Sequence, residues 1–422
     1  SDDYIRVNSG NITISGAVKD GIHAADYFEM NGGLLDIAST SDAIDCDEGY
    51  IVINAGSIKI NSVGDGIKTS YKSTDIARYI TINGGTLDIN VTGDASKGIK
   101  SKDAITIAGG TITVKTTGNA YYDTGDAEIT SSCGVKADGN ISISGTGTLT
   151  VTSSGKGGKG ISADGTLTFD GCTTTVTTTG DQYVYGADDT AAKAIKSDGN
   201  LTVNSGTIKV STSKTEAEGL ESKATLVING GTIEIEAYDD GINADNHIEI
   251  TGGSVYVYST VNDAIDSNGT LTISGGTVVA VGSTSPEAGF DCDNNTFKIT
   301  GGTLIGVGGS TSTPTSSAST QRSIIYGSTS AYQLVHIESS TGTELITFKV
   351  PRTYSQSMTL LFSSPSMTNT SYTIYTGGSV SGGSNFHGLY TGATYTKGTS
   401  VATFTASNMV TTVGTSGGGG RP

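Results

Sequence analysis

The chain lacks tryptophan and is poor in several other residue types. Its 422 residues include only 5 prolines, 4 cysteines and 8 phenylalanines, whereas glycine occurs 61 times and serine and threonine are abundant. This composition argues against long helices and favours many short strands joined by frequent turns. Runs of 18 apolar residues are also absent, so we expect no membrane contact by this segment.

Positive charge is scarce as well. Lysine and arginine number 24 against 41 aspartates and glutamates, which gives a formal net charge of -17 and a pI near 4.5. This balance excludes nucleic acid and anionic membranes as natural partners, and it favours cations. The chain begins SDDYIRV, without Met or an apolar leader, so we expect that any signal segment lies outside this sequence.

Internal repetition is the strongest pattern in the sequence. Each unit reads as a corner, a short strand, a glycine turn and a second strand, as in DGIHAADYFEMNGGLLDIASTS from Asp20 onward. The small corner residue recurs at intervals of 22 to 36 residues, at Gly21, Ala43, Gly66, Gly98, Gly134, Gly160, Ala194, Gly219, Gly241, Ala264 and Gly289.

Apolar residues alternate with polar ones inside each unit, as in Ile51, Ile53, Ile58 and Ile60. Strands of this kind cannot bury a face alone, but stacked copies can. The sequence therefore predicts an all-β fold, a right-handed parallel β-helix (a β-solenoid) of about eleven coils. The handedness follows the general rule for parallel crossovers.

The repeat divides the chain. We expect the parallel β-helix over residues 1–309, a Ser/Thr-rich linker or loop over 310–321, a C-terminal β element over 322–413 and a flexible Gly-rich tail over 414–422. The last two coils expose an apolar strip where earlier coils are polar, so we expect the C-terminal element to cover them. The strip consists of Val279, Val281, Ile305 and Val307.

Asparagines and cysteines also follow the repeat. Asparagines before Gly, Ala or Ser suit positive backbone φ and predict a stacked ladder; they are Asn31, Asn54, Asn83, Asn204 and Asn229. Cys46 and Cys292 take equivalent corner positions nine coils apart, or roughly 43 Å, which excludes a bond between them. Cys133 and Cys172 lie at non-equivalent positions, so we expect no disulfide there either.

Stacking turns the corners into columns of side chains, and these columns carry charge in blocks. The strings DAIDCD (42–47) and DAIDSN (263–268) place acids that would lie over acids of the next coil. Carboxylates roughly 5 Å apart repel by about 3 kcal/mol at an effective dielectric near 20. A divalent cation bound between them makes the net electrostatic interaction attractive. Because oxygen donors dominate, the pattern predicts several Ca²⁺ ions. The candidate ligands are Asp20, Asp42, Asp45, Asp47, Asp65, Glu218, Glu221, Asp240, Asp245, Asp263, Asp266, Asp291 and Asp293.

An alternative interpretation of these acids stays open. Aspartate at a tight corner also hydrogen-bonds nearby amides, and an exposed corner can be solvated without metal. We expect His23 to be a surface corner residue rather than a ligand.

A lysine block separates the two acidic blocks. It can neutralise Asp138, Asp164 and Asp198 beside it, or it can bind a polyanionic chain such as a uronate polysaccharide. The lysines are Lys97, Lys100, Lys136, Lys159, Lys193 and Lys196. Tyr256 and Tyr258 point outward in the predicted register, where they can stack on sugar rings or pack under another part of the chain.

The corner motif followed by IxIxGGxIxI resembles secreted bacterial carbohydrate-binding proteins built as right-handed parallel β-helices, which in turn are similar to calcium-dependent pectate lyases. The resemblance spans residue 1 to about 309, with a similar C-terminal element. It implies an extracellular or cell-surface monomer with Ca²⁺ at the acidic corners, bound to acidic polysaccharide of the polygalacturonate or pectin type, with cellulose as a further candidate ligand.

Enzymatic activity is the alternative to binding alone. Lyase relatives carry a DDGxD corner near a basic residue, but here Ser41 and Asn262 replace the first acid of two corners. If the chain is a pectate lyase acting by β-elimination, Lys68 or Lys100 is the expected catalytic base. A purely structural surface adhesin shares the same fold.

Overall fold

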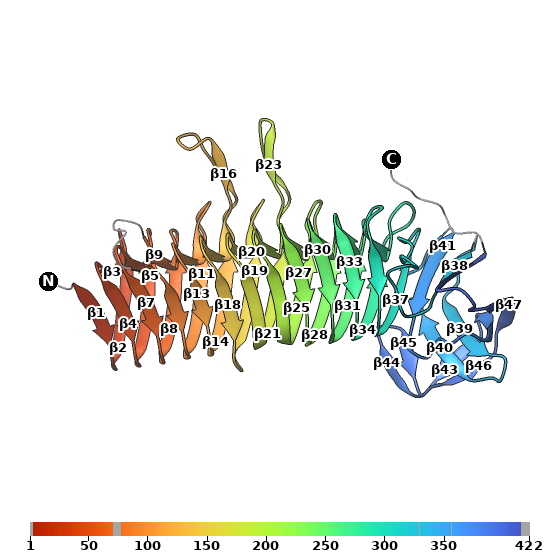
Figure 1. The fold of residues 1–422 in the computed structure, drawn as a ribbon. Coiled ribbons are helices and arrows are strands. Elements are labelled where there is room, and N and C mark those ends of the chain that lie inside the picture. The colour runs from red at the N-terminus through yellow and green to blue at the C-terminus, as the bar shows by residue number, and fades with distance from the viewer. Residues whose placement is uncertain (1–2, 71–76, 329, 356, 415–422) are drawn as a thin grey trace. The chain divides into compact units, whose positions relative to one another are not determined.

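The computed structural model describes residues 3–70, 77–328, 330–355 and 357–414. These residues form strands and turns without any helix, so none of them offers a helix long and apolar enough to cross a membrane. The chain divides into two compact units, residues 1–239 and 240–422. The all-β parallel solenoid predicted from the repeat is confirmed (Figure 1). Of the tail predicted over 414–422, residues 415–422 lie outside the described part.

The first unit stacks its coils in parallel register. Its corner strands are β3 (Ile22–Ala24), β6 (Ile44–Cys46), β9 (Ile67–Thr69), β12 (Lys97–Ser101), β17 (Cys133–Ala137), β20 (Lys159–Ala163), β24 (Ile195–Ser197) and β26 (Leu220–Ser222). With β29 (Ile242–Ala244), β32 (Ile265–Ser267) and β35 (Phe290–Asp291) of the second unit, the described residues contain 11 corner strands, as the eleven predicted coils require.

Two longer stretches of each coil form the body of the first unit. The leading strands are β1 (Tyr4–Val7), β4 (Tyr27–Met30), β7 (Tyr50–Ile53), β10 (Ile80–Ile82), β13 (Ile105–Ile107), β18 (Ile141–Ser144) and β27 (Thr225–Ile228). The following strands are β2 (Asn11–Ala17), β5 (Leu34–Ser39), β8 (Ser57–Ser62), β11 (Thr86–Val91), β14 (Thr111–Thr116), β19 (Thr148–Ser153) and β28 (Thr232–Ala237). In two coils one strand spans both stretches, β21 (Leu167–Thr178) and β25 (Leu201–Thr212).

Similar β-branched apolar residues lie over one another inside the coils. Ile44 pairs with Ile67, and Ile99 pairs with Val135, which pairs with Ile161; all five are fully buried. Burying a side chain of this size contributes about 1.5–3 kcal/mol, so the solenoid is stable only as a stack.

Two β-hairpins interrupt the coils of the first unit. They are β15 (Tyr121–Asp123) with β16 (Glu128–Thr130), and β22 (Tyr183–Tyr185) with β23 (Asp188–Thr190). Both are antiparallel and project outward from the coils that carry them (Figure 1). They fall in two long intervals of the sequence repeat, Gly98 to Gly134 and Gly160 to Ala194, but the repeat does not predict their structure.

The second unit holds further coils and the C-terminal element. Its body strands are β30 (His247–Ile250), β31 (Ser254–Ser259), β33 (Thr270–Ile273), β34 (Thr277–Val281), β36 (Phe297–Ile299) and β37 (Thr303–Gly308). The element consists of β38 (Ser323–Ser328), β39 (Leu334–Ser339), β40 (Glu344–Lys349), β41 (Met358–Ser363), β42 (Ser371–Thr376), β43 (Ser379–Ser381), β44 (Ser384–Phe386), β45 (Leu389–Thr391), β46 (Thr394–Thr396), β47 (Thr399–Thr405) and β48 (Val410–Gly414).

The C-terminal element covers the apolar strip of the last coils, as predicted. Strand β41 pairs antiparallel with β37, and the strip is at most 1% exposed within a cluster that includes Phe348 and Leu360. Arg352 donates to the carbonyls of Ser259 and Thr260 at 2.7 Å. Residues 310–321, expected as a linker or loop, hydrogen-bond back to the last coil, for example from the Thr315 amide to the Phe297 carbonyl.

The asparagine ladder is confirmed, but its predicted backbone conformation is wrong. Asn54 donates to Asn31, and Asn83 donates to Asn54, both at 2.8 Å. None of these asparagines has positive φ; the glycine that follows two positions later has it, as at Gly33 and Gly56. The side-chain amides stack because the coils do, and glycine makes the turn. All four cysteines are free and buried, as predicted.

Candidate functional site

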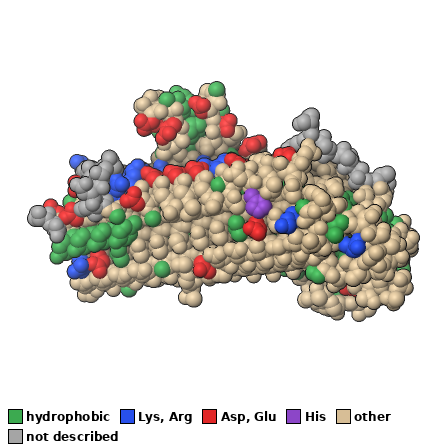
Figure 2. Space-filling view, viewed as in Figure 1, with side chains coloured by type: hydrophobic (Ala, Val, Ile, Leu, Met, Phe, Trp, Pro, Cys, Tyr) green, Lys and Arg blue, Asp and Glu red, His purple; other side chains and the backbone are tan. Residues whose placement is uncertain are grey.

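The corner columns exist as predicted. In the first unit His23, Asp45, Lys68, Lys100, Lys136, Ser162, Lys196 and Glu221 follow one another in register from strand to strand. In the second unit Asn243, Asp266 and Asp291 do the same. Residues remote in sequence are therefore neighbours along one edge, and Figure 2 shows acidic and basic side chains alternating on it.

Aspartates at the start of each corner bind backbone amides of the next coil. Asp20 accepts from the Asp42 amide at 3.3 Å, Asp42 from the Asp65 amide at 2.6 Å, and Asp65 from the Lys97 amide at 2.7 Å. In the second unit Asp240 accepts the Asp263 amide at 3.1 Å. The alternative role, hydrogen bonding to nearby amides, thus accounts for part of this column.

Lys68, one of the two lysines predicted as a catalytic base, forms ion pairs with two aspartates. Its ammonium lies 2.8 Å from Asp42 and 3.9 Å from Asp65. Burial lowers the pKa of Lys68, but the hydrogen bond to Asp42 and the charges of both aspartates outweigh burial and raise it. A base must lose its proton near neutral pH, and the raised pKa of Lys68 disfavours that loss; its role as a base stays a prediction.

The first acidic block gathers around His23. Its Nδ1 lies 3.6 Å from both Asp20 and Asp45, and its Nε2 lies 3.2 Å from Asp47. Ligand atoms of Asp20, His23 and Asp45 all fall within 4.8 Å of one another. Burial raises the pKa of Asp45. The sequence analysis left His23 outside this cluster, and its imidazole makes the donor set less typical of Ca²⁺.

The second acidic block brings together Asp240, Asp263 and Asp266. Their carboxylate oxygens lie within 4.8 Å of one another, and Asn243 donates to Asp266 at 3.0 Å. Asp263 is only 3% exposed, and burial raises its pKa to about 8 despite a hydrogen bond from the Ala288 amide. An all-oxygen set with crowded negative charge fits a hard divalent cation.

The remaining predicted ligands lie outside these two clusters. Asp291 accepts from the Ser312 hydroxyl at 2.6 Å, Asp293 is exposed, and Asp245 is half-buried. Glu218 and Glu221 lie 2.8 and 3.1 Å from the Lys193 ammonium. These two carboxylates therefore neutralise the positive charge of Lys193. Burial raises the pKa of Glu218 to about 7.

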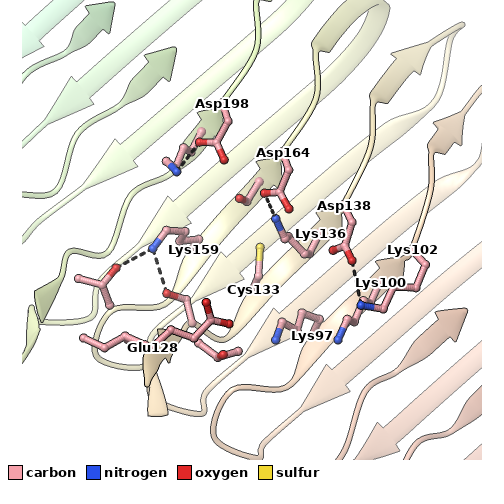
Figure 3. A pocket seen from close by; sticks show the side chains of 16 residues that line it. Lys97, Lys100, Lys102, Glu128, Cys133, Lys136, Asp138, Lys159, Asp164 and Asp198 are labelled. Carbon is pink, nitrogen blue, oxygen red and sulfur yellow. Dashed lines mark hydrogen bonds and ion pairs between the residues drawn. The ribbon is translucent and has the colours of Figure 1, made fainter. Parts of the chain in front are cut away.

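Most of the predicted lysine block lines one groove of the first unit, of about 600 Å³ (Figure 3). We call it the lysine groove; it is lined by Lys97, Lys100, Lys102, Glu128, Ile129, Thr130, Ser131, Cys133, Lys136, Asp138, Lys159, Ser162, Asp164, Thr190, Lys196 and Asp198. Six lysines face four carboxylates here, a local excess of two positive charges in a chain of net charge -17.

One row of the groove is neutralised. Lys102 lies 3.0 Å from Asp138 and Lys196 lies 2.6 Å from Asp198, while Lys136 pairs with Asp164. Neutralisation of these aspartates was one of the two predicted roles of the block. Lys102 itself lies outside the predicted columns and was missed.

Three lysines of the groove have no carboxylate within ion-pair distance among the described residues: Lys97, Lys100 and Lys159. Burial, helped by the charge of Lys100, lowers the pKa of Lys97 to about 8. Burial also lowers the pKa of Lys159 to about 8, and Lys196 and Lys193 act in the same direction. Lys97 and Lys159 flank Cys133 in one column, so the small thiol leaves space between two ammonium groups.

Tyr256 and Tyr258 do not form a surface for sugar rings. Tyr256 is 5% exposed and stacks on His387 with ring centroids 3.7 Å apart, and Tyr258 lies against Arg352. The C-terminal element covers both, which is the alternative that the sequence analysis left open.

A partly exposed tyrosine ladder was missed by the sequence analysis. Tyr4, Tyr27, Tyr50 and Tyr79 stack in turn with ring centroids 4.7 to 5.1 Å apart. The signal was present in the sequence, since each tyrosine directly precedes an apolar strand residue of its coil. The rings cover one another's faces, so the ladder presents mainly ring edges and hydroxyls.

Comparison with protein families gives one match. Residues 1–75 and 214–343 are similar to a family described as carbohydrate-binding domain-containing protein, which supports a carbohydrate-binding role. Comparisons with curated proteins and with solved structures find no significant match. Both acidic clusters lie inside the matched segments, whereas every residue that lines the lysine groove lies between them.

Proposed function

We propose that this carbohydrate-binding chain holds an acidic plant polysaccharide of the polygalacturonate type, outside the cell, with calcium at its acidic corners. One observation carries the proposal: Lys97, Lys100 and Lys159 line a single groove, and none of them pairs with a carboxylate of the described residues. Burying ammonium groups without counter-charge costs free energy, and an anionic ligand offsets that cost. A repeating polyanion suits a groove whose floor is built from stacked coils.

Calcium has a separate role in this proposal. Asp240, Asp263 and Asp266 would hold it, because their oxygens already converge. A bound Ca²⁺ would neutralise the crowded carboxylates and offer open coordination positions to a carboxylate of the polysaccharide. Asp20 and Asp45 with His23 form a second, mixed set of donors.

Direct binding measurements test the proposal. Isothermal titration with oligogalacturonates should show binding, whereas uncharged oligomers of the same length and cello-oligosaccharides should bind at least tenfold more weakly. If the ion bridges ligand and protein, removing calcium with a chelator should also weaken the binding of oligogalacturonates. Equal affinity for charged and uncharged oligomers would refute the acidic specificity.

The affinity should also depend on pH. Lys97 and Lys159, whose pKa values lie at about 8, bind an anion only when protonated. Raising the pH from 7 to 9.5 removes these protons, so the affinity should fall about tenfold or more, with proton uptake on binding near pH 8. Titrations in buffers of different ionisation enthalpy measure both quantities. A flat affinity across this range would count against these lysines as ligands of the anion.

A lyase is the second candidate, and the lowered pKa values of Lys97 and Lys159 favour it. A neutral amine in the groove would take the C5 proton of a uronate, the C5–H electron pair would form a C4–C5 double bond, and the departing O4 would leave with the C4–O electron pair and take a proton from solvent. Incubation with polygalacturonate and calcium, followed by ultraviolet absorbance of the unsaturated product, tests this. Product formation that a Lys159→Met variant lacks would establish turnover.

A further inference from the structure

The two hairpins are inserted on either side of one coil of the groove. They precede the corner strands β17 and β24, and the coil between them carries only a short connection before β20. That connection lies between the two hairpin bases. The Ala120 amide donates to the Lys156 carbonyl at 2.7 Å, and the Gly157 amide donates to the Asp181 carbonyl at 2.8 Å.

The packing at Gly157 is close on both sides. A Cβ atom there would lie 2.6 Å from the Thr190 methyl group and 3.0 Å from Ala120, so the hairpin bases press against bare backbone. Gly157 also has a φ of 65°, which glycine adopts without strain. The sequence therefore allows both hairpins to converge on a single coil.

Lys159 lies at the point of convergence. Its ammonium donates to the Ser131 hydroxyl at 2.9 Å and to the Thr190 hydroxyl at 2.8 Å. Ser131 follows β16 directly and Thr190 ends β23. One lysine of the groove thus contacts the base of each hairpin, and it does so through neutral hydroxyl groups that a stronger acceptor can replace.

The hairpins also meet farther from the coils. The rings of Tyr122 and Tyr185 stack with centroids 4.0 Å apart and planes 12° from parallel. The hairpins otherwise have little core, since Tyr121, Val184 and Tyr185 are 51%, 62% and 48% exposed. A two-stranded hairpin is marginally stable in water, so this one aromatic pair is a major contact between them.

The charge of the hairpins is opposite to that of the groove floor. Their half-buried or exposed acids are Asp123, Asp126, Glu128, Asp188 and Asp189, and Figure 2 shows them as a red cluster above the coils. Glu128 also lines the groove beside the lysines (Figure 3). An acidic chain is repelled by this rim and attracted by the unpaired lysines below it.

We infer that the two hairpins form a clasp that retains an acidic polysaccharide in the lysine groove, held closed by the stack of Tyr122 on Tyr185 and linked to the bound anion through Lys159. This inference rests on the proposed function, because it concerns the same ligand. The clasp slows escape of the chain past an acidic rim. We therefore expect opening of the clasp to change the dissociation rate of the ligand more than its association rate.

Dissociation of a fluorescent oligogalacturonate, followed by stopped flow, tests the clasp. Tyr122→Ala and Tyr185→Ala should each raise the dissociation rate about tenfold, and the double variant should be no faster than either single one, since both break the same contact. Tyr121→Ala is the matched control, because this neighbouring tyrosine is exposed and outside the stack; it should leave the rate within twofold. Circular dichroism checks that every variant is folded.

The outcomes separate the two proposals. If the wild type binds and the Tyr122→Ala rate equals that of Tyr121→Ala, the clasp is wrong and the proposed function stands. If the wild-type protein does not bind oligogalacturonate, both are overturned. If a variant is unfolded, replacing residues 184–189 by a short Gly-Ser turn removes Tyr185 without removing a residue that lines the groove; faster dissociation is expected, and an unchanged rate would contradict the clasp.

Discussion

Replacing Lys97, Lys100 and Lys159 together by methionine should lower the affinity for oligogalacturonate by at least a hundredfold. None of the three ammonium groups has a carboxylate partner among the described residues. Lys97 donates to the Ala95 carbonyl and Lys159 to two hydroxyl groups, which are neutral acceptors that an anion can replace. A hydrogen bond to a charged group contributes about 1.5–3 kcal/mol, and about 1.4 kcal/mol is tenfold in affinity. Methionine keeps the apolar stem and removes only the charge. Isothermal titration measures the change.

Two controls make this result specific. Lys115→Met removes an exposed lysine from β14 on the body sheet and should change the affinity less than twofold. Lys59→Met removes an exposed lysine from β8, also outside the groove, and should likewise change the affinity less than twofold. If the triple variant binds within threefold of wild type, the groove is not the binding site.

Calcium should raise the thermal stability of the protein by a large amount. An ion that binds only the folded state at a hundred times its dissociation constant stabilises it by about 2.7 kcal/mol. Asp263→Asn should abolish most of the response, because this carboxylate is central to the second acidic cluster. Differential scanning calorimetry with calcium and with chelator measures both effects.

The same substitution has an opposite effect without calcium. Burial disfavours the charged form of Asp263, whose pKa is about 8, so a neutral asparagine should be at least as stable as the aspartate at pH 8 in chelator. Asp88→Asn, an exposed change on the body sheet, is the control and should keep the calcium response. Loss of stability in chelator together with a retained response would exclude calcium from this corner.

The sequence predicts columns well and individual partners poorly. A column follows from the spacing of corner residues, and the registers of Lys100 with Lys136 and of Asp45 with Lys68 are as expected. Pairing depends on the rotamer of a long side chain, which can reach a carboxylate on its own coil or on the next one. Lys196 forms an ion pair with Asp198 of its own coil, whereas Lys136 forms one with Asp164 of the next coil.

Insertions are the second limit on prediction from the sequence. The repeat shows where a coil is too long, but the residues of an insertion share no period with the rest of the chain. Neither the stack of Tyr122 on Tyr185 nor the position of Ser131 beside Lys159 has a signal in the repeat. Cover of the last coils was predictable because four apolar side chains replaced polar ones in an otherwise regular pattern.

Cys133 lies between two lysines of one column, so the number of coils sets the distance between those two positive charges. Each rung adds about 4.8 Å along the stack, so Lys97 and Lys159, two rungs apart, are separated by about 9.6 Å at the backbone. Deleting or duplicating a single rung changes this separation in whole steps and leaves the ends of the molecule intact. Selection can therefore match the protein to polymers of different charge spacing without redesigning any pocket.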